Sequence, residues 1–242
     1  MHTGLEKNLS HLKKSSASLC AALRAYPAVP LRTLLAALQL ALVVSLVGLA
    51  SFAPPAYSAS KTLLVLGDSL SAEYGLQRGQ GWVALLEKRL LQNHIEAHIV
   101  NASVSGETTI GGKNRLPALL QKNHPSLVVV ELGANDGLRG LPVVETTNNL
   151  RAIITAAKKI NAQVLLIGMQ LPPNYGADYT KRFAALFPAV AKETKSSLVP
   201  FMLDAIVMQP QLFQADRVHP TAAAHPLILE TIWPHLRPLV SK

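Results

Sequence analysis

From Lys61 onward, short apolar runs of the length of β-strands alternate with longer segments whose apolar residues recur at helical spacing. The five strand-like runs are Thr62–Leu66, Ile95–Val100, Leu127–Leu132, Gln163–Gly168 and Leu198–Leu203. Helical patterns between them include Trp82–Asn93, Val143–Ile160 and Thr180–Lys195. Strands that are apolar throughout are buried on both faces, and parallel strands need helical crossovers. The alternation therefore predicts a three-layer α/β/α fold with a central parallel sheet of about five strands.

The segment over residues 60–242 is long enough for one domain with a sizeable core, and no internal repeat or low-complexity tract interrupts it. The whole chain has 23 Lys and Arg residues against 14 Asp and Glu, a formal net charge of +9. Charges of both signs are mixed, without basic runs interleaved with aromatic residues, so no nucleic-acid partner is expected. The positive balance favours anionic substrates or surfaces, including a transient contact with a membrane.

The first 59 residues have the features of a secretory signal peptide. An apolar run over 33–50 follows a basic amino-terminal region, and small residues at 56–59 predict cleavage near Ser58 or Ala59. A catalytic domain over 60–242 would then work in the periplasm or be secreted. The alternative is an uncleaved anchor in the inner membrane, because the apolar run approaches the ~20 residues that span a bilayer.

A serine stands where the first strand-like run ends, in Gly67-Asp68-Ser69-Leu70. Open α/β sheets carry their chemistry at the carboxyl ends of the strands, so Ser69 is a candidate nucleophile. The same residue types also dominate turns, and the tripeptide alone does not distinguish a turn from a nucleophile. A serine hydroxyl needs a general base within hydrogen-bond reach and a third group that orients the base.

Asp216 and His219 form the one compact candidate pair for that task. At this spacing the carboxylate would accept a hydrogen bond from one ring nitrogen of His219, leaving the other nitrogen to take the serine proton. Pro220 follows directly and is expected to open the last helix at its first position. Asp136 is an alternative third member, although its place beside Asn135 favours a structural role.

Two loops that follow strand-like runs carry candidate donors for an oxyanion. Gly106 would let the backbone approach a substrate closely, and Asn135 presents a side-chain amide after the third run. Together with the backbone N–H of Ser69, they would make three donors.

Taken in order, these residues resemble the four sequence blocks of the SGNH (GDSL) hydrolase superfamily. The resemblance covers roughly Lys61 to Leu239. The longer strings over 67–76 and 131–142 are similar to the branch that holds bacterial arylesterases and acyl-CoA thioesterases with protease and lysophospholipase activity. The resemblance implies the flavodoxin-like version of the α/β/α fold and a serine esterase or thioesterase that forms an acyl-enzyme.

The resemblance also implies a role for each residue: Ser69 as nucleophile, His219 as base, Asp216 as the orienting carboxylate, and Ser69, Gly106 and Asn135 as the oxyanion hole. Its implied substrates are small acyl esters or thioesters, among them aryl esters, fatty-acyl thioesters and lysophospholipids. No cofactor and no metal are expected, and the protein is expected to be a monomer.

Three positions depart from the pattern of the thioesterase-like members. A glycine is expected where Glu73 and Arg217 stand, and a glutamine where His225 stands. None of them is a chemical residue of the four blocks, so the departures bear on substrate preference. His225 lies six residues beyond His219 and would face the same rim. The remaining histidines have no carboxylate or second ligand at a telling spacing and are expected to be surface or packing residues: His94, His98, His124 and His235.

Two other site types fit the sequence less well. The nucleophile elbow of α/β-hydrolases has a glycine two residues after the serine, whereas Ser71 stands there. A metal site lacks its ligands, because there is no His-Glu-x-x-His helix and the only cysteine, Cys20, lies in the leader. The mature domain would then have no thiol for a disulfide or for catalysis.

Asp68, Pro172 and Tyr175 are candidate substrate contacts. Asp68 adjoins the nucleophile, with the alternative that it braces the turn through backbone N–H groups. The other two lie in Met169–Tyr179, which is rich in turn formers and apolar side chains and would line an acyl groove or simply connect strand to helix. Two other functions stay open: a carbohydrate O-deacetylase on the same scaffold, and a non-catalytic lipid-binding module.

Overall fold

A computed structural model describes residues 30–33, 35–36, 39 and 61–241. Nearly all of the expected signal peptide over 1–59 lies outside these residues, so its processing stays a prediction. None of the helices in the described ranges is long and apolar enough to cross a membrane. Contacts divide the chain into two units, Met1–Ser58 and Ala59–Lys242, and the second holds the sheet and the helices that cover it.

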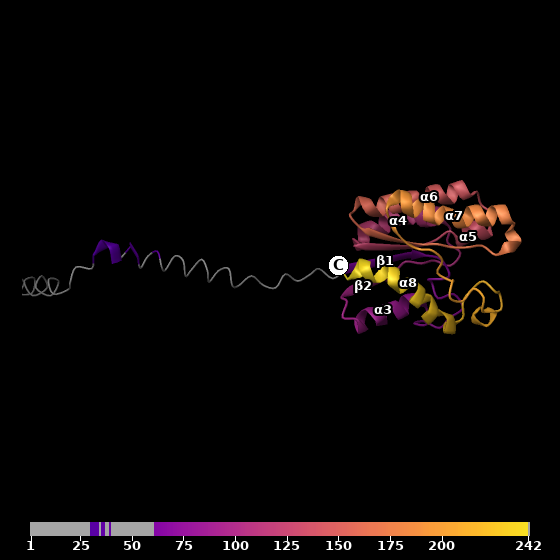
Figure 1. Ribbon diagram of the computed structural model, residues 1–242, viewed down its shortest axis with the longest axis horizontal. Helices are drawn as coiled ribbons and strands as arrows, with labels where there is room; N and C mark the ends of the chain where they lie inside the picture. Colours follow the sequence, from indigo (N-terminus) through magenta and orange to yellow (C-terminus); the bar gives the residue numbers. More distant parts are fainter. Residues whose placement is uncertain (1–29, 34, 37–38, 40–60, 242) are drawn as a thin grey trace, which may run out of the picture. The chain divides into compact units, whose positions relative to one another are not determined.

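The sheet has five parallel strands, as predicted, and their order is β2-β1-β3-β4-β5 (Figure 1 labels β1 and β2). They are β1 (Lys61–Gly67), β2 (Ala97–Asn101), β3 (Leu127–Glu131), β4 (Gln163–Ile167) and β5 (Ser197–Val199). Two boundaries differ from the expected runs by two residues or more. β2 begins at Ala97 instead of Ile95, and β5 stops before Pro200, which has no N–H to donate to a ladder.

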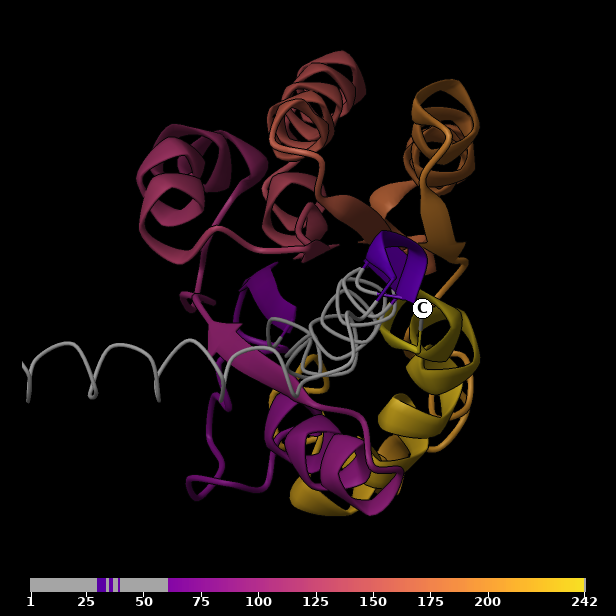
Figure 2. The same ribbon diagram turned by 90° about the vertical axis from the view of Figure 1, so that its left-hand side faces the viewer.

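Helices cover both faces of the sheet, which confirms the three predicted layers (Figure 2). On one face, α3 (Trp82–Gln92) packs against α8 (His225–Val240). The other face carries α4 (Thr109–Asn123), α6 (Val143–Lys159) and α7 (Ala177–Thr194), and the short α5 (Ala134–Leu138) follows β3. In α6, the buried residues Leu150, Ile153, Ile154 and Ala157 recur at helical spacing, which places them on one stripe against the core.

The carboxyl ends of β1 and β3 lie side by side at the centre of the sheet. β1 pairs with β2 on one side and with β3 on the other, so the strand order reverses at β1. Open α/β sheets bind their ligands in the crevice at such a switch point. Gly67 and Glu131, the last residues of the two strands, are opposite each other in the register. The predicted site residues Ser69 and Asn135 follow within a few positions.

The last helix begins at His225 and not at Pro220, so the expected start was wrong. Pro220 instead forms a β-bridge with Phe213. Ala222–Ala224 form a 3₁₀ turn, and Pro226 stands in the first turn of α8, where a proline loses no helical hydrogen bond. The proline after His219 therefore fixes a loop instead of opening a helix.

His225 is buried between α3 and α8, with 2% of its surface exposed, and does not share the rim with His219. Its Nδ1 accepts a hydrogen bond from the backbone N–H of Trp82 at 3.0 Å, which joins the start of α8 to the first turn of α3. Burial lowers the pKa of His225 to about 4, against a smaller opposing effect of the Glu73 carboxylate. The imidazole is therefore neutral in the folded protein at neutral pH.

Replacing His225 with glutamine should make the fold more resistant to acid, because glutamine can accept the same hydrogen bond but does not titrate. The pKa of His225 is lowered from 6.5 to about 4 in the folded protein, so the unfolded chain binds a proton that the folded protein does not. Because the unfolded chain takes up this proton, the free energy of unfolding of the wild type falls progressively as the pH falls from 6.5 to about 4. We expect His225→Gln to gain about 2 to 3 kcal/mol relative to wild type between pH 7 and pH 4.

Urea unfolding at both pH values measures this gain in the free energy of unfolding. His225→Leu is the matched control, since it removes the titration but leaves the Trp82 N–H without an acceptor, and it should be less stable than His225→Gln at both pH values. A glutamine variant as acid-sensitive as wild type would contradict the assignment.

Candidate active site

Ser69 follows β1 directly and lies in a turn that Asp68 braces. The Asp68 Oδ1 accepts a hydrogen bond from the backbone N–H of Leu70 at 3.0 Å, and the Asp68 carbonyl accepts one from the N–H of Ala72 at 3.0 Å. These bonds fix the backbone on both sides of Ser69. Asp68 is buried, but it also borders the cavity beside Ser69, so the structural role and the position at the substrate site coexist.

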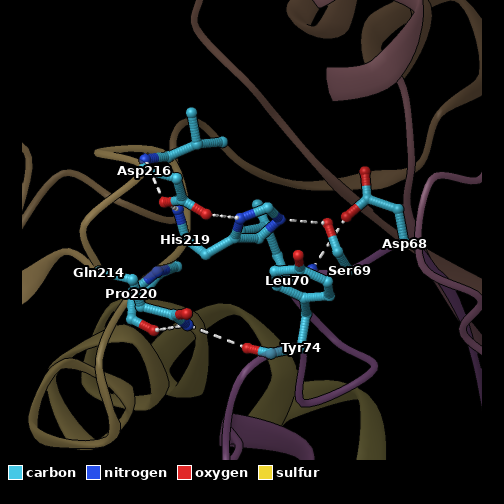
Figure 3. A network of polar contacts seen from close by, with 9 residues as sticks. Asp68, Ser69, Leu70, Tyr74, Gln214, Asp216, His219 and Pro220 are labelled. Atoms are coloured by element: carbon cyan, nitrogen blue, oxygen red, sulfur yellow. Dashed lines mark hydrogen bonds and ion pairs between the residues drawn. The ribbon is translucent and has the colours of Figure 1, made fainter.

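His219 reaches Ser69 from the far end of the chain (Figure 3). Its Nε2 lies 2.8 Å from Ser69 Oγ, and its Nδ1 lies 2.7 Å from Asp216 Oδ2. The other carboxylate oxygen of Asp216 accepts hydrogen bonds from the backbone N–H groups of Val218 at 2.9 Å and His219 at 3.0 Å. Because an ionised carboxylate only accepts, Nδ1 carries the proton and Nε2 is left to accept from the serine hydroxyl.

Asp216 is ionised across the physiological pH range. Its partial burial works against the charge, but hydrogen bonds from the N–H groups of His219 and Val218 and from the imidazole outweigh burial and lower the pKa of Asp216 to about 2. A negative carboxylate at Nδ1 would stabilise the imidazolium that forms when His219 takes up a proton.

Two contacts hold the His219 loop against the turn that follows Ser69. The ring of Tyr74 lies against the imidazole of His219, with centroids 4.3 Å apart and a tilt of 38°. Gln214 Nε2 donates to the carbonyls of Tyr74 at 2.9 Å and Pro220 at 3.0 Å, so it bridges the two loops (Figure 3). Tyr74 and Gln214 were not predicted from the sequence, because a contact between distant loops leaves no local pattern.

Asn135, the second residue of α5, is held on both sides by hydrogen bonds. Its Nδ2 donates to Asp68 Oδ2 at 3.1 Å and to the backbone carbonyl of Glu107 at 3.0 Å. The side chain borders the same cavity as Ser69. Its amide is therefore oriented before any substrate binds.

Gly106 lies in the loop after β2 with a φ of +79°, a conformation that favours glycine. Its carbonyl accepts a hydrogen bond from Arg139 Nη2 at 2.9 Å, which ties this loop to the end of α5. Within residues 61–241, the backbone N–H groups of Ser69 and Gly106 have no hydrogen-bond acceptor. Both N–H groups are therefore available to a ligand.

Glu131, at the end of β3, forms hydrogen bonds with the turn that contains Ser69. Its Oε2 accepts hydrogen bonds from the Asp68 N–H at 3.2 Å and from the Ser71 hydroxyl at 2.6 Å, and Ser71 Oγ in turn accepts from Trp82 Nε1 at 3.1 Å. Burial, and then the charge of Asp68, raise the pKa of Glu131 well above its usual range. Burial also raises the pKa of Asp68 to about 6, although the Leu70 N–H opposes the shift. The role of Glu131 was not predicted from the sequence. The signal for a buried functional carboxylate was an acidic residue at the end of an otherwise apolar strand.

Asp136 is engaged away from His219. Its carboxylate accepts hydrogen bonds from the Thr109 N–H at 2.8 Å and the Thr109 hydroxyl at 2.5 Å, and it is buried. These bonds tie α5 to the first turn of α4, the structural role expected for a residue beside Asn135. It is Asp216, and not Asp136, that contacts the imidazole of His219.

A cavity of about 400 Å³ opens beside Ser69, within the range of sites for small molecules. Its polar and charged lining consists of Asp68, Ser69, Asn135, Gln170, Arg217 and His219. Its apolar lining consists of Leu70, Ala134, Leu138, Met169, Leu171, Pro172, Pro173, Phe201, Leu203, Val207, Pro210, Phe213 and Val218. In the described part of the chain, no group of three His, Cys, Asp or Glu side chains is arranged to hold a metal ion.

The two candidate contacts from the loop after β4 differ in placement. Pro172 lines the cavity, as an acyl groove would require. Tyr175 does not line it; its hydroxyl donates to the backbone carbonyl of Leu138 at 3.2 Å, in a 3₁₀ turn over Pro173–Tyr175. The turn directs Tyr175 toward α5, so its placement does not support a direct contact with substrate.

The chain is similar to known proteins over the whole of this domain. It matches the GDSL-like Lipase/Acylhydrolase family over residues 65–227. It is 50% identical over 183 residues to Esterase TesA of Pseudomonas aeruginosa, which spans 76% of this chain and 91% of that protein. It is 43% identical over 184 residues to thioesterase 1/protease 1/lysophospholipase L1 of Escherichia coli, which spans 76% of this chain and 87% of that protein.

Solved structures show the same similarity. A crystal structure of TesA superposes with a TM-score of 0.73 at 50% identity, covering 74% of this chain and 99% of that one. The psychrotrophic esterase EstA from Pseudoalteromonas sp., inhibited by monoethylphosphonate, superposes with a TM-score of 0.72 at 40% identity, covering 75% and 100%. The superfamily predicted from the four blocks is confirmed, and so is the prediction that the chain is an ester hydrolase. The chain belongs to the GDSL-like lipase/acylhydrolase family.

Proposed function

We propose that the protein hydrolyses acyl esters and thioesters with Ser69 as nucleophile, His219 as general base and Asp216 as the carboxylate that orients the base. The observation that carries the proposal is the continuous hydrogen-bonded chain from Ser69 Oγ to His219 at 2.8 Å and from His219 to Asp216 at 2.7 Å. Such a chain supplies what a serine hydroxyl needs to become nucleophilic at neutral pH.

The reaction proceeds in two acyl transfers. Ser69 Oγ attacks the acyl carbonyl carbon while His219 Nε2 takes the hydroxyl proton. The tetrahedral intermediate collapses, the bond to the alcohol or thiol breaks, and the same proton passes from His219 to the leaving group. Water then attacks the acyl-enzyme, His219 takes a proton from it, and that proton returns to Ser69 as the carboxylic acid leaves.

The oxyanion of each tetrahedral intermediate is stabilised by three donors. The N–H groups of Ser69 and Gly106 have no acceptor within residues 61–241, and the Asn135 amide would exchange one of its two hydrogen bonds, to Asp68 or to the Glu107 carbonyl, for one to the oxyanion. Losing one such donor typically raises the barrier by about 2.7 to 4 kcal/mol. No cofactor takes part in these steps.

The acyl chain occupies the apolar part of the cavity beside Ser69. Thirteen of the lining residues are apolar, which suits a hydrocarbon chain better than an acetylated sugar. The names of the relatives, esterase and thioesterase/lysophospholipase, support fatty-acyl esters, thioesters and lysophospholipids as the substrate classes. The protein acts on these substrates as a monomer.

We further propose that residues 1–59 form a signal peptide and that the catalytic domain over 60–242 works outside the cytoplasm. The uncharged apolar run over 33–50 and the small residues at 56–59 support this proposal. After expression of the full chain in a bacterium, the periplasmic fraction should yield protein whose amino terminus lies near Ala59 or Ser60. Full-length protein recovered only from the inner membrane would instead favour an anchor.

Replacing Ser69 with alanine should abolish both turnover and labelling by a fluorophosphonate probe, because the probe reacts only with an activated serine. We expect kcat for p-nitrophenyl esters to fall by about 10⁴-fold or more in Ser69→Ala and His219→Ala. Asn135→Ala should lose about 10²- to 10³-fold in kcat with little change in KM, because its donor acts on the transition state.

Thr155→Ala, on the outer side of α6, is a control and should retain wild-type labelling. Full activity in Ser69→Ala, or a wild-type protein that neither labels nor turns over any ester, would overturn the proposed mechanism. Tight binding of a fatty acyl ligand without turnover would indicate the non-catalytic lipid-binding alternative.

The value of kcat/KM should rise with acyl-chain length until the apolar cavity is full. Each methylene that is buried contributes about 0.8 kcal/mol, which corresponds to an increase of up to about fourfold per methylene. A series of p-nitrophenyl esters from acetyl to dodecanoyl, measured below the critical micelle concentrations, gives the profile. A maximum at acetyl, together with turnover of acetylated sugars, would favour a deacetylase instead.

A further inference from the structure

Arg217 adopts a left-handed backbone conformation inside the loop that carries Asp216 and His219. Among the described residues, the non-glycine residues with positive φ are Glu73, His94, His124, Asn161, Lys195 and Arg217. Four of them stand at the carboxyl ends of α3, α4, α6 and α7, where a left-handed residue commonly ends a helix. Only Glu73 and Arg217 adopt it inside loops.

The left-handed conformation of Glu73 has a visible structural use. Its carboxylate accepts hydrogen bonds from the N–H groups of Gly79, at 3.0 and 3.1 Å, and Gly81, at 2.8 Å, and so closes the loop before α3. Arg217 has a φ of 58°, and its side chain makes no hydrogen bond and no ion pair with any residue in 61–241. The backbone conformation belongs to the turn in which the Arg217 N–H donates to the Gln214 carbonyl at 2.9 Å, so it is the side chain that has no use within the described part of the fold.

The position of Arg217 indicates a use for this side chain. It lies between Asp216 and His219, it is exposed, and it lines the cavity beside Ser69. It is the one Lys or Arg among the lining residues of this cavity. The rest of the lining is mostly apolar and suits the acyl chain, so the leaving group of the substrate would extend toward the open side, where an exposed side chain can reach it.

We propose that Arg217 is a specificity-determining residue that binds a phosphate group on the leaving-group side of the scissile ester or thioester. A guanidinium presents a planar fork of donors that matches a phosphate, and it keeps its charge at every pH at which the enzyme works. Two substrate sources carry this group: a lysophospholipid, through its glycerophosphate, and an acyl-CoA, through its nucleotide phosphates. The inference rests on the proposed function, because it assigns the leaving-group subsite of the same active site.

The test compares phosphate-bearing and neutral substrates with the same acyl chain. One pair consists of 1-acylglycerol 3-phosphate and 1-monoacylglycerol, and the other of acyl-CoA and the acyl N-acetylcysteamine thioester. For each pair, the preference is the kcat/KM of the phosphate-bearing substrate divided by that of the neutral one. In Arg217→Gly, which removes the charge and tolerates positive φ, we expect the preference to fall about tenfold, mainly through KM.

Three further measurements separate charge recognition from a general disturbance of the loop. Arg217→Asn also tolerates positive φ and should lose the same preference, whereas Arg217→Lys should keep part of it, as a point charge without the fork. Added salt should lower the preference of the wild type but not that of Arg217→Gly. Arg182→Gln, which removes an equal charge from the exposed surface of α7, should leave the preference unchanged.

The outcomes distinguish this inference from the proposed function. If the wild type hydrolyses the substrates but Arg217→Gly keeps the wild-type preference in both pairs, the inference is wrong and the proposed function stands. Equal losses on phosphate-bearing and neutral substrates would assign Arg217 to loop geometry and likewise overturn it. If the preference falls in only one pair, that pair identifies the source of the phosphate. If the wild type hydrolyses none of the substrates, both the proposed function and the inference fail.

Discussion

The arrangement of the active site depends on the buried carboxylate of Glu131. It ends β3 after a run of buried apolar residues, and its Oε2 holds the N–H of Asp68 and the hydroxyl of Ser71, on the two sides of Ser69. Gly67 stands opposite in the register, where a Cβ would lie 2.8 Å from the Glu131 carboxylate, so the close approach of β1 and β3 requires glycine at this position. A buried negative charge without a cation would be costly, and the raised pKa of Glu131 shows that burial favours its neutral form. The nucleophile turn is thus attached to the interior of the sheet and not only to its own loop.

His219, the proposed general base, is held in a different way. His219 is 150 positions from Ser69 in the chain, and its loop is held by polar contacts as well as by the packing of Leu212 and Phe213 against the core. Asp216 binds the imidazole and two backbone N–H groups, Gln214 bridges to the carbonyl of Tyr74, and Pro220 pairs with Phe213. Catalytic residues commonly combine a rigid scaffold with a loop in this way. The cavity wall formed by the His219 loop, including Arg217 and Val218, is therefore held by contacts other than those that fix the Ser69 turn.

The sequence predicted those features of the fold and the site that local residue patterns determine. Largely apolar runs identified all five strands, and they are most continuous in β1, β3 and β4, which are buried on both faces, whereas the edge strand β2 is partly exposed. The order and spacing of Ser69, Asn135, Asp216 and His219 identified the residues that the fold brings together. Prediction from the sequence failed where tertiary contacts determine the position of a residue. Pro220 was assigned to a helix start that Pro226 takes, because the loop after His219 needs the bridge to Phe213. His225 was expected at the same rim as His219. Instead it is buried at the α3–α8 interface, where its Nδ1 accepts a hydrogen bond from the backbone N–H of Trp82. Trp82 is 143 positions from His225, so no window of the chain contains that signal, whereas Phe213 is close to Pro220 but pairs with it only in the folded loop.

Asp68 couples the two halves of the site. Its Oδ1 braces the backbone after Ser69 and its Oδ2 holds the amide of Asn135, so one carboxylate orients both the nucleophile turn and a side chain suited to stabilise an oxyanion. The same carboxylate, when ionised, places a negative charge near the point where an oxyanion would form, and low polarity in the cavity strengthens their repulsion. Burial raises the pKa of Asp68 to about 6, which reduces the free-energy difference between its charged and neutral forms near neutral pH. The hydrogen bond from Asn135 does not require that charge, since a neutral carboxyl group still offers its carbonyl oxygen as an acceptor. Protonation of Asp68 would therefore remove its repulsion of an oxyanion while keeping the hydrogen bond that positions the Asn135 amide.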